Sequence, residues 1–318
     1  ESVHYTLGEY PALDARVIAV VKNIRDVARR GAAAPHTLVA LEQTLHEMRL
    51  IKREAELPLL RKACEVSAAA HVRAMRATKP GRNEWQIAAE VAAEFTLNDC
   101  EPGYGTICGG GDNACILHYT ENNMPLKDGE LLLLDAGAEY RGYTGDITRT
   151  FPVNGRFSAA QKAVYDVVLA AQKAAIATLV VGAPVSQPHE VATRVLAEGL
   201  VQLGLLKTSA EYPDVDALIK ADRQKQFFMH GTGHWLGMDV HDVGRYKLLG
   251  QYRHFEAGMV MTVEPGLYIA PGTPDVPAQY YGIGIRIEDD VLVTAQGPEV
   301  LTHGVPKEVA EIEALMAA

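Results

Sequence analysis

Amphipathic helices are the clearest pattern along the chain. From Leu57 onward, apolar and small residues recur every three or four positions, and Pro80–Gly81 ends this helical spacing. Asn83 and Gln86 are typical of a capping box, which predicts a second helix through about Leu97. A helix pair is therefore expected in the first half of the chain.

A second helix pair is predicted after the middle of the chain. Ser158 with Gln161 repeats the capping-box pattern and begins a helix that we expect to end near Gly182. A further helix is predicted from about Ser186 to Leu203. Both halves of the chain therefore contain two consecutive helices.

Strands are predicted after each helix pair. Leu131–Leu134 has the pattern of a short buried strand, and Thr144–Val153 that of its antiparallel partner across a glycine-containing turn. The second half has four strand-like stretches: Phe227–His234, Met259–Glu264, the residues around Tyr268, and Ile283–Val293. Helix pairs followed by antiparallel strands predict an α+β fold, and their shared order suggests an internal structural duplication.

Composition narrows the classes of function. The formal net charge of the 318 residues is −10, which argues against nucleic acid as a partner, because a surface that binds phosphates needs a basic field. The four cysteines form no C-x-x-C pair, so we expect reduced thiols and a cytoplasmic location. No apolar run approaches the roughly 18 residues of a membrane span, and no signal peptide is visible, so no membrane partner is expected.

Two aspartates follow the first predicted strand. Asp135 ends the run LLLLD, and the intervening GAEYRGYTG can turn the chain back before Asp146. A hairpin would bring both carboxylates to one edge of a sheet. Taken singly, each has an ordinary interpretation, since Asp135 can cap a strand and Asp146 can stabilise a turn.

Two glutamates form a similar arrangement in the second half. Glu264 ends the apolar run MVMTV just before a Pro-Gly pair, and Glu288 interrupts the strand-like IGIRIEDDVLV. A charge buried in such a strand costs several kcal/mol unless it is paired or bound to metal. Arg286 is the local candidate for a partner of Glu288, or for a residue that orients a metal ligand. The next two aspartates, 289 and 290, are interpreted as simple surface charges.

Histidines gather around the glycines of HGTGHWLGMDVH. His230, His234 and His241 lie within twelve positions, and the glycines oppose a helix, so an extended or irregular segment is expected. One histidine can then bind a metal while the others face a substrate. His118 in ILHYTENN is a further candidate, either for proton transfer or as a buried structural histidine.

Together, four carboxylates and one imidazole predict a centre for two divalent cations, because clustered negative charges repel one another without cations. Rival chemistries have little support: the sequence has no G-x-S-x-G elbow, no Walker loop and no Cys/His nucleophile context. A two-metal hydrolase is the function that these residues favour. The predicted ligands are Asp135, Asp146, His234, Glu264 and Glu288.

Five segments resemble the pita-bread metallopeptidases, a family that includes methionine aminopeptidase, prolidase and the bacterial Xaa-Pro aminopeptidases. The segments CILHYTENN, DAGAEYRGYTGDITRTFPVNG, FFMHGTGHWLGMDVHDVG, TVEPGLYIAP and YGIGIRIEDD are most similar to bacterial Xaa-Pro aminopeptidase (aminopeptidase P). The resemblance extends over essentially Met48 to Met316. It implies a pita-bread fold, an antiparallel sheet with flanking helices and two pseudo-twofold halves.

The resemblance also implies roles for single residues. Asp146 and Glu288 match the carboxylates that bridge the two metals, Asp135 matches a chelating ligand of one metal, and His234 and Glu264 match the ligands of the other. Glu264 is the implied proton acceptor and donor. The implied substrate-binding positions are His118, His230, His241, Tyr268 and Arg286, with His118 and His241 also implied in catalysis through the tetrahedral intermediate.

The implied reaction is hydrolysis of the bond between an N-terminal residue and a following proline. Metals lower the pKa of bound water, so that hydroxide forms near neutral pH. Manganese suits the oxygen-rich ligand set best, with cobalt or zinc as substitutes. The implied partners are peptides with proline at the second position, and a homo-oligomer is compatible with the resemblance.

The resemblance defines the expected domain organisation. The chain begins at Glu1 without a methionine, and residues 31–35 (GAAAP) are typical of a linker. We expect residues 1–47 to be the C-terminal remnant of an N-terminal domain plus its linker, in a truncated chain, and residues 48–318 to be the catalytic metallopeptidase domain. Activity of such a fragment stays an open question at this point.

Three alternatives remain from the sequence. Prolidase is the nearest, since the loop GRYKLLGQYRH can supply the cationic clamp that a dipeptide carboxylate needs. Methionine aminopeptidase fits the GHWLGMDVHD context less well. A creatinase-like enzyme or a non-enzymatic binding protein would be marked by lost ligands, whereas all five are present.

Overall fold

The helix predicted at Leu57 forms α3 (Leu57–Ala77) in the computed structural model, which describes residues 2–318. It is followed by α4 (Glu84–Leu97), and the backbone N–H of Asn83 donates to Gln86 Oε1 over 2.9 Å, as expected for a capping box. Ser158 and Gln161 make the same reciprocal bonds at the start of α5 (Ala159–Ile176). The capping patterns therefore located two helix starts correctly.

The α5 helix ends earlier than predicted, at Ile176 rather than near Gly182. The chain beyond it pairs with a distant segment: Gly182 N–H donates to Phe255 C=O over 2.9 Å, and Phe255 N–H donates to Ala183 C=O over 2.8 Å. These long-range bonds replace the helical ones. The next helix, α6 (Gln187–Gln202), agrees with its prediction.

The first-half sheet has the predicted antiparallel pair at its centre. Strand β5 (Leu131–Asp135) lies between β4 (Ile107–Gly110) and β8 (Thr148–Pro152), with Asp135 opposite Ile107 and Thr148. The turn between β5 and β8 contains a small hairpin, β6 (Ala138–Tyr140) with β7 (Tyr143–Thr144), which also pairs with β3 (Glu101–Pro102). The hairpin returns Asp146 to the end of β5.

The second-half strands form two antiparallel groups. One is β11 (Val260–Val263), β14 (Asp289–Thr294) and β15 (Gly297–Val300), and the other is β12 (Gly266–Ile269) with β13 (Ile283–Arg286). The single strand predicted over Ile283–Val293 is thus broken at Ile287 and Glu288. The N–H of Glu288 instead donates to Thr148 C=O over 3.0 Å, which joins the two halves of the molecule.

The strand predicted at Phe227–His234 is wrong. This stretch is irregular and forms one isolated bridge just beyond it, between Trp235 and Met261. The reason is a tertiary contact: the His234 N–H bonds to the Thr262 side chain over 3.0 Å, while the Thr262 N–H still donates to the His234 C=O over 2.9 Å, so the pairing with β11 is only partial. The expectation of an irregular glycine-rich segment around His234 is confirmed.

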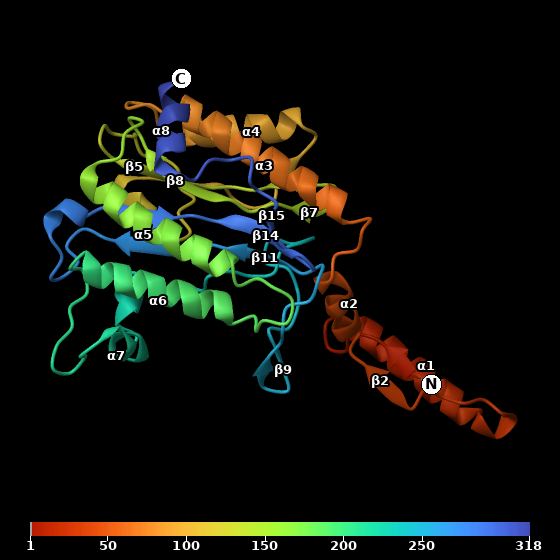
Figure 1. The fold of residues 1–318 in the computed structure, drawn as a ribbon. Helices are drawn as coiled ribbons and strands as arrows, with labels where there is room; N and C mark the ends of the chain where they lie inside the picture. Colours follow the sequence, from red (N-terminus) through yellow and green to blue (C-terminus); the bar gives the residue numbers. More distant parts are fainter. Residues whose placement is uncertain (1) are drawn as a thin grey trace.

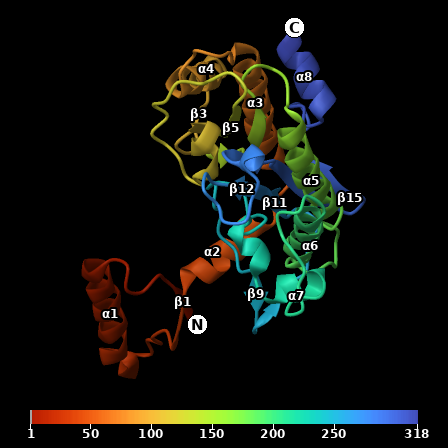
Figure 2. The same cartoon turned by 90° about the vertical axis from the view of Figure 1, so that its left-hand side faces the viewer.

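Helices cover the strands on two sides of this joint. Helices α5 and α6 run side by side along one flank of the strands, and α3 and α4 lie together at the other end (Figures 1 and 2). Helix α3 contacts β6 and β7, whereas α5 contacts β11, β12 and β13. Both halves therefore consist of a helix pair and antiparallel strands, which is the predicted α+β arrangement.

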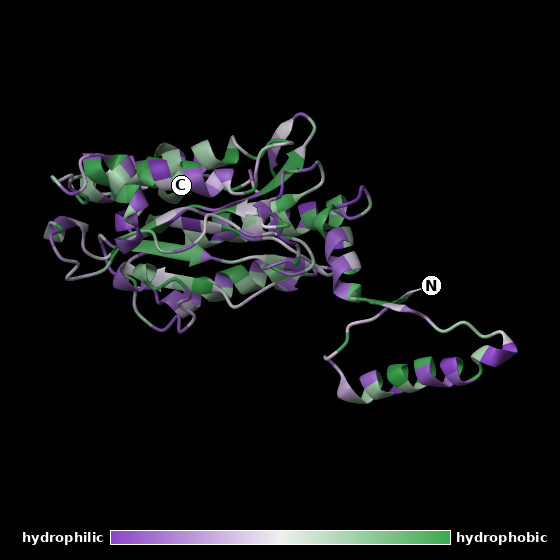
Figure 3. Cartoon of the chain, turned by 90° about the horizontal axis from the view of Figure 1, so that it is seen from below, coloured by the Kyte–Doolittle hydropathy of each residue, from purple (hydrophilic) through white to green (hydrophobic). Residues whose placement is uncertain are grey.

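The N-terminal residues form an arm beside this body. Strands β1 (Ser2–His4) and β2 (Thr37–Val39) pair in parallel around α1 (Pro11–Asp26), and α2 (Leu41–Leu50) leads to the body. No residue of α1 is buried, and Figure 3 shows this helix apart from the rest of the chain. The remaining elements are α7 (Val215–Lys220), the hairpin β9 (Lys247–Leu248) with β10 (Gln251–Tyr252), and α8 (Val309–Ala317).

The helices of this fold are too short or too polar to span a membrane. Among residues 2–318, none has the length and apolar character needed to cross a bilayer.

Candidate metal centre

The predicted ligands converge where the two halves of the body meet. A pocket of about 480 Å³ lies at this joint, between the ends of β5 and β11 and the break before β14. Two carboxylates come from the first half and two from the second. All five predicted ligands line it: Asp135, Asp146, His234, Glu264 and Glu288.

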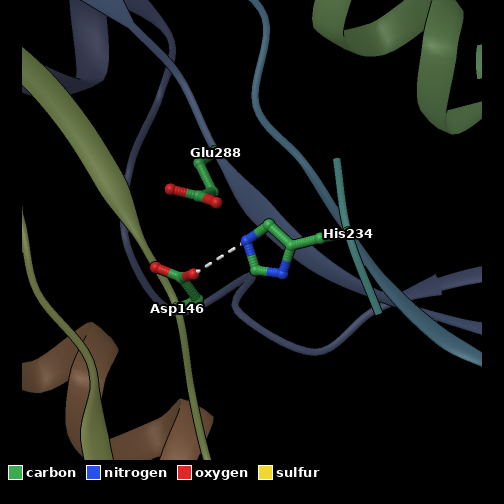
Figure 4. Close-up of side chains that lie close together, drawn as sticks. All are labelled: Asp146, His234 and Glu288. Carbon is green, nitrogen blue, oxygen red and sulfur yellow. Dashed lines mark ion pairs between the residues drawn. The ribbon is translucent and has the colours of Figure 1, made fainter. Parts of the chain in front are cut away.

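Asp146, His234 and Glu288 form the tightest group. One potential ligand atom of each lies within 4.8 Å of the others, and the His234 Nε2 is 3.4 Å from Asp146 Oδ2 (Figure 4). The Glu288 carboxylate is held by the Thr148 hydroxyl, which donates to its Oε2 over 2.6 Å. Three side chains from distant parts of the sequence thus point at one small volume.

The orientation of the His234 ring is fixed by its backbone. Its Nδ1 lies 3.0 Å from the Trp235 carbonyl, which can only accept, so Nδ1 carries the proton of the neutral ring. That tautomer leaves the Nε2 lone pair aimed at the carboxylates. Metal-binding histidines commonly have this arrangement, in which a backbone carbonyl orients the far nitrogen.

Asp135 forms an ion pair with Arg286, which neutralises the charge of its carboxylate. Arg286 donates to Asp135 Oδ2 over 2.6 Å and to the Tyr268 hydroxyl over 3.0 Å. Of the two roles expected for Arg286, a direct partner of Glu288 or a residue that orients a metal ligand, the bond to Asp135 supports the second, and Arg286 reaches Glu288 only through the Thr148 hydroxyl that bonds both. Arg286 instead connects Asp135 and Tyr268 across the two halves.

Glu264 lies at the end of β11, beside two histidines. Its N–H donates to Thr232 C=O over 2.8 Å, and its carboxylate is 3.7 Å from His234 Nε2 and 3.8 Å from His230 Nδ1. The partly exposed carboxylate faces the pocket. A residue here can bind a cation and exchange a proton with a bound molecule.

Burial and mutual repulsion shift the titration of these carboxyls. Burial raises the pKa of Asp135, against the effect of Arg286, and raises that of Glu264 to about 7. Burial and then Asp146 raise the pKa of Glu288 well above its usual range. Burial disfavours the His234 imidazolium, but Asp146 and Glu264 outweigh it and raise its pKa to about 9. The raised pKa values mean that bound protons neutralise part of the negative charge of this site. Bound cations would neutralise the same charge.

The donor set fits divalent cations. Hard carboxylate oxygens with one imidazole are the ligands that manganese and similar first-row ions accept. The raised carboxyl pKa values and the aimed Nε2 of His234 are the structural signs of that fit.

The predicted substrate histidines surround this centre. His230 Nε2 lies 2.8 Å from the Tyr268 hydroxyl, and burial together with Arg286 lowers the His230 pKa to about 4. His118 and His241 are more exposed and line the same pocket, with the His241 ring centroid 4.3 Å from that of His234. The structure thus brings every predicted substrate-binding residue to the pocket or to its immediate support.

Tyr104 and Thr148 belong to the site but were not predicted. The Tyr104 hydroxyl donates to Asp135 Oδ1 over 2.6 Å and also contacts Asp146 Oδ1. Thr148 bonds both Glu288 and the Arg286 Nε. The signal for Tyr104 in the sequence is its position between two glycines, and for Thr148 its position two residues after Asp146.

The interpretation of Asp289 and Asp290 as surface charges is wrong. Both are almost completely buried, at 1% and 0% exposure. Asp289 pairs with Arg149 over 2.7 Å and with Lys307 over 2.6 Å. Asp290 accepts the Asp146 N–H over 2.9 Å. Because their partners are 12 to 226 positions away in the chain, local sequence context gave no sign of burial.

Comparisons with known proteins agree with this geometry. The chain is 48% identical to the Xaa-Pro aminopeptidase of Escherichia coli strain K12, over 99% of this chain and 70% of that protein. It is 52% identical to the Xaa-Pro aminopeptidase of Haemophilus influenzae, over 86% of this chain and 62% of that protein. The solved structure of Pseudomonas aeruginosa aminopeptidase PepP superimposes with a TM-score of 0.93 at 52% identity, covering 100% of this chain and 71% of that one.

The family is shown by a direct match as well. The model of metallopeptidase family M24 matches residues 58–295, a span that contains all five predicted metal ligands. The likeness to solved aminopeptidases extends this agreement to the fold. With the ligands gathered at the joint of two similar halves, the chain belongs to metallopeptidase family M24.

Proposed function

We propose that this chain hydrolyses the peptide bond between an N-terminal residue and a following proline, as an Xaa-Pro aminopeptidase that uses two divalent metal ions. One observation carries the proposal: four carboxylates and the His234 Nε2 converge in a pocket of about 480 Å³. The relatives named Xaa-Pro aminopeptidase supply the choice of substrate. The chain spans about two thirds of their length, so the activity of the fragment is itself part of the proposal.

The proposed metal ligands are the five residues that line the pocket. Asp146 and Glu288 would bridge two cations, Asp135 would complete one, and His234 with Glu264 the other. Manganese is the proposed ion, with cobalt or zinc as substitutes. When bound, the cations supply a nucleophilic water with a lowered pKa and stabilise negative charge on the substrate oxygen.

The remaining residues perform the proton transfer and positioning. Glu264, whose pKa burial raises to about 7, can accept a proton from the attacking water and return it to the proline nitrogen. His118 and His241 stand at the pocket wall, where their N–H groups can bind the scissile carbonyl region. His230 and Tyr268 lie side by side and complete the substrate-binding wall.

Pocket charge favours an aminopeptidase over a dipeptidase. A dipeptide carboxylate needs a free cation, yet Arg286 is the only Lys or Arg among the described lining residues, and it is already paired with Asp135. In the loop that can supply a clamp, Arg253 pairs with Glu47 over 2.9 Å, and neither Arg245 nor Lys247 lines the pocket. The structure therefore supports peptides longer than two residues.

The test compares a tripeptide with a dipeptide. We expect manganese-dependent release of arginine from Arg-Pro-Pro, loss of that activity with a chelator, and little turnover of Gly-Pro. Glu264→Gln should lower kcat about 10²- to 10⁴-fold, as expected for removal of a group that transfers protons. Glu54→Gln, an exposed carboxylate outside the pocket, is the matched control. Faster cleavage of Gly-Pro would contradict the proposal and indicate a dipeptidase.

A domain assignment accompanies this proposal. Residues 48–318 contain every proposed ligand and are proposed as the catalytic domain, with residues 1–47 as the end of a preceding domain. The exposed α1 helix, which has no buried residue, is compatible with that assignment. Activity of a fragment that begins at Met48 would test whether the arm is needed.

A further inference from the structure

The loop that carries His241 is closed at its base by backbone hydrogen bonds. We call residues 235–242 the His241 loop. The Asp242 N–H donates to Trp235 C=O over 2.9 Å, and the Leu236 N–H donates to Val260 C=O over 3.2 Å. In the middle, Gly237 C=O accepts the Thr144 N–H over 2.9 Å. The loop is therefore fixed to both halves of the body.

Asp242 is the buried end of this loop, and two cations hold its carboxylate. Lys52 Nζ donates to Asp242 Oδ2 over 3.0 Å, and Arg49 donates to Oδ1, which also accepts the Val243 N–H over 2.9 Å. The side chains of Lys52 and Asp242 are each 1% exposed. Arg49 also donates to Asp239 Oδ2 over 2.7 Å, so it bonds two aspartates of the loop.

Arg49 lies in the last turn of α2, and Lys52 lies in the short segment that joins α2 to α3. This segment is anchored to the body, because Ile51 forms a bridge with Met259 and the Lys52 N–H donates to Gly258 C=O over 2.8 Å. It lies before residue 58, where the match to the family model begins. Residues that lie outside the region matched by the family model therefore hold the His241 loop in place.

Packing around the carboxylate leaves little freedom. A Cβ on Gly237 would lie 2.1 Å from Asp242 Oδ2 and 2.7 Å from Lys52 Nζ, so the loop backbone lies directly against the ion pair. Burial lowers the pKa of the Lys52 ammonium, and Asp242 counteracts that effect. A buried pair of this kind is costly to form and depends on its geometry, so it specifies one loop conformation.

We propose that Arg49 and Lys52 are positioning residues that act through Asp242 to place the His241 ring in the active-site pocket. His241 directly precedes Asp242, and its ring lies against that of His234. The inference rests on the proposed function, because it concerns the substrate-binding role of His241. It adds one residue at the end of α2 and one of the segment that follows to the machinery of that reaction.

The expected kinetic effect is selective. If the His241 ring stabilises charge that develops in the reaction, its misplacement lowers kcat and leaves KM nearly unchanged. A shift of about 1 Å is enough for a loss on the order of 100-fold. Manganese affinity should fall less than kcat. The backbone N–H of His234 is held outside the loop by the Thr262 hydroxyl, although the His234 ring shares the Trp235 carbonyl with the Asp242 N–H.

The experiment combines a double-mutant cycle with hydrogen exchange. Lys52→Met and Arg49→Met each leave Asp242 with one cation, which favours a folded protein, and Arg49→Lys restores a positive charge. Each is measured alone and together with His241→Ala. Amide exchange of residues 235–242 is followed in the same proteins. Glu47→Gln is the matched control, because it breaks the ion pair between α2 and Arg253 without touching Asp242.

Three results together support the proposal. Lys52→Met lowers kcat 10- to 100-fold in the native background and less than twofold in the His241→Ala background. Exchange of residues 235–242 accelerates at least tenfold while the rest of the chain is unchanged, and Arg49→Lys recovers most of the loss seen in Arg49→Met. Glu47→Gln leaves both measurements as in the unmodified protein.

Two results overturn it. Equal losses with and without His241 would mean that the ion pair acts on general structure, and unchanged exchange in the loop would mean that it fixes nothing. The exchange measurement needs no substrate. If the unmodified protein cleaves no Xaa-Pro peptide, the proposed function fails, whereas the exchange result still decides whether the pair fixes the His241 loop.

Discussion

Two neighbouring aspartates behind the metal centre are equally buried but are stabilised in opposite ways. Asp289 lies in a cluster of charges, whereas Asp290 lies among neutral hydrogen-bond donors. We call the first region, Arg149, Asp289 and Lys307, the charged wall. The second, Asp290 with Cys64 and the Asp146 N–H, is the neutral wall. Both walls contact proposed metal ligands, so their difference separates what charge and hydrogen bonding contribute to one site.

The charged wall joins four parts of the chain. Arg149 on β8 donates to the Glu288 carbonyl and to Asp289, and Lys307 approaches Asp289 from the segment before α8. Gln172 on α5 adds a bond of 2.7 Å to the same carboxylate. Burial opposes its ionisation, but Arg149 and Lys307 prevail and lower the Asp289 pKa to about 2.

Among residues 2–318, no cation contributes to the pKa shift of the carboxyl in the neutral wall. Asp290 Oδ2 accepts the Asp146 N–H over 2.9 Å and the Cys64 thiol over 3.2 Å. Burial, followed by Asp146, raises the Asp290 pKa well above its usual range. A neutral carboxyl can accept both bonds, so the wall holds the backbone of a proposed metal ligand without placing another full charge beside it. The two walls therefore differ in what they do. Ion pairs in the charged wall join distant segments of the chain, whereas hydrogen bonds to a neutral carboxyl in the neutral wall orient Asp146.

Asp289→Asn should have the largest effect on stability. It leaves Arg149 and Lys307 buried without their counter-charge, and removal of one partner from a buried pair costs about 3–5 kcal/mol. The free energy of unfolding from urea titration measures this. Glu299→Gln, which breaks the half-exposed pair with Arg61, is the control and should cost less than about 1 kcal/mol. Equal losses for the two variants would remove the distinction between the walls.

His71 tests the charged wall through pH. Its Nε2 lies 2.8 Å from the Ile147 carbonyl, and burial, followed by Arg149, lowers its pKa to about 3. The unfolded chain binds a proton at His71 near pH 6.5 but the folded chain does not until about pH 3, so stability falls as pH decreases through this window. The slope is about 1.4 kcal/mol per pH unit.

The measurement is the unfolding free energy between pH 7 and pH 5. His71→Gln keeps a donor for the Ile147 carbonyl and should reduce the slope by about the contribution of one proton. An unchanged slope in this variant would show that other groups cause the acid sensitivity. The neutral wall has no counterpart to this test, since the groups that shift the Asp290 pKa are Asp146, Cys64 and Asp289 rather than a histidine.

The sequence predicted the elements better than it predicted these walls. Helix starts at Asn83 and Ser158 were correct because capping is local, and the β5–β8 pairing followed from two apolar runs joined by a glycine-containing turn. The break at Glu288 was missed, because it depends on the long-range bond to Thr148.

The candidate site shows the same limit. Its five proposed ligands were found because buried carboxylates and glycine-flanked histidines are unusual in themselves. Tyr104 and Asp290 were not, because their roles come only from partners that the fold brings close. A residue with an unremarkable local context has no signal in the sequence until its contacts are known.

Asp290→Asn should cost less than Asp289→Asn, about 1 kcal/mol or less at pH 7. The amide oxygen can still accept the Asp146 N–H, and no cation loses its partner. Manganese affinity should fall less than about threefold, because the backbone of Asp146 stays in place. A loss as large as that of Asp289→Asn would show that Asp290 is ionised and that an uncounted cation supports it.

Cys64→Ser should give the smallest effect and makes the sharpest distinction between the walls. The thiol, whose pKa burial raises well above its usual range, acts as a neutral donor to Asp290, and a hydroxyl can replace it in that role. We expect a change in unfolding free energy of about 0.5–1 kcal/mol, from the shorter C–O bond in a packed site. Cys64→Ala removes the donor as well, and should cost about 1 kcal/mol more than Cys64→Ser. If the two variants were equally stable, the thiol would fill space only, and the Asp146 N–H would be the one contact by which Asp290 holds the centre.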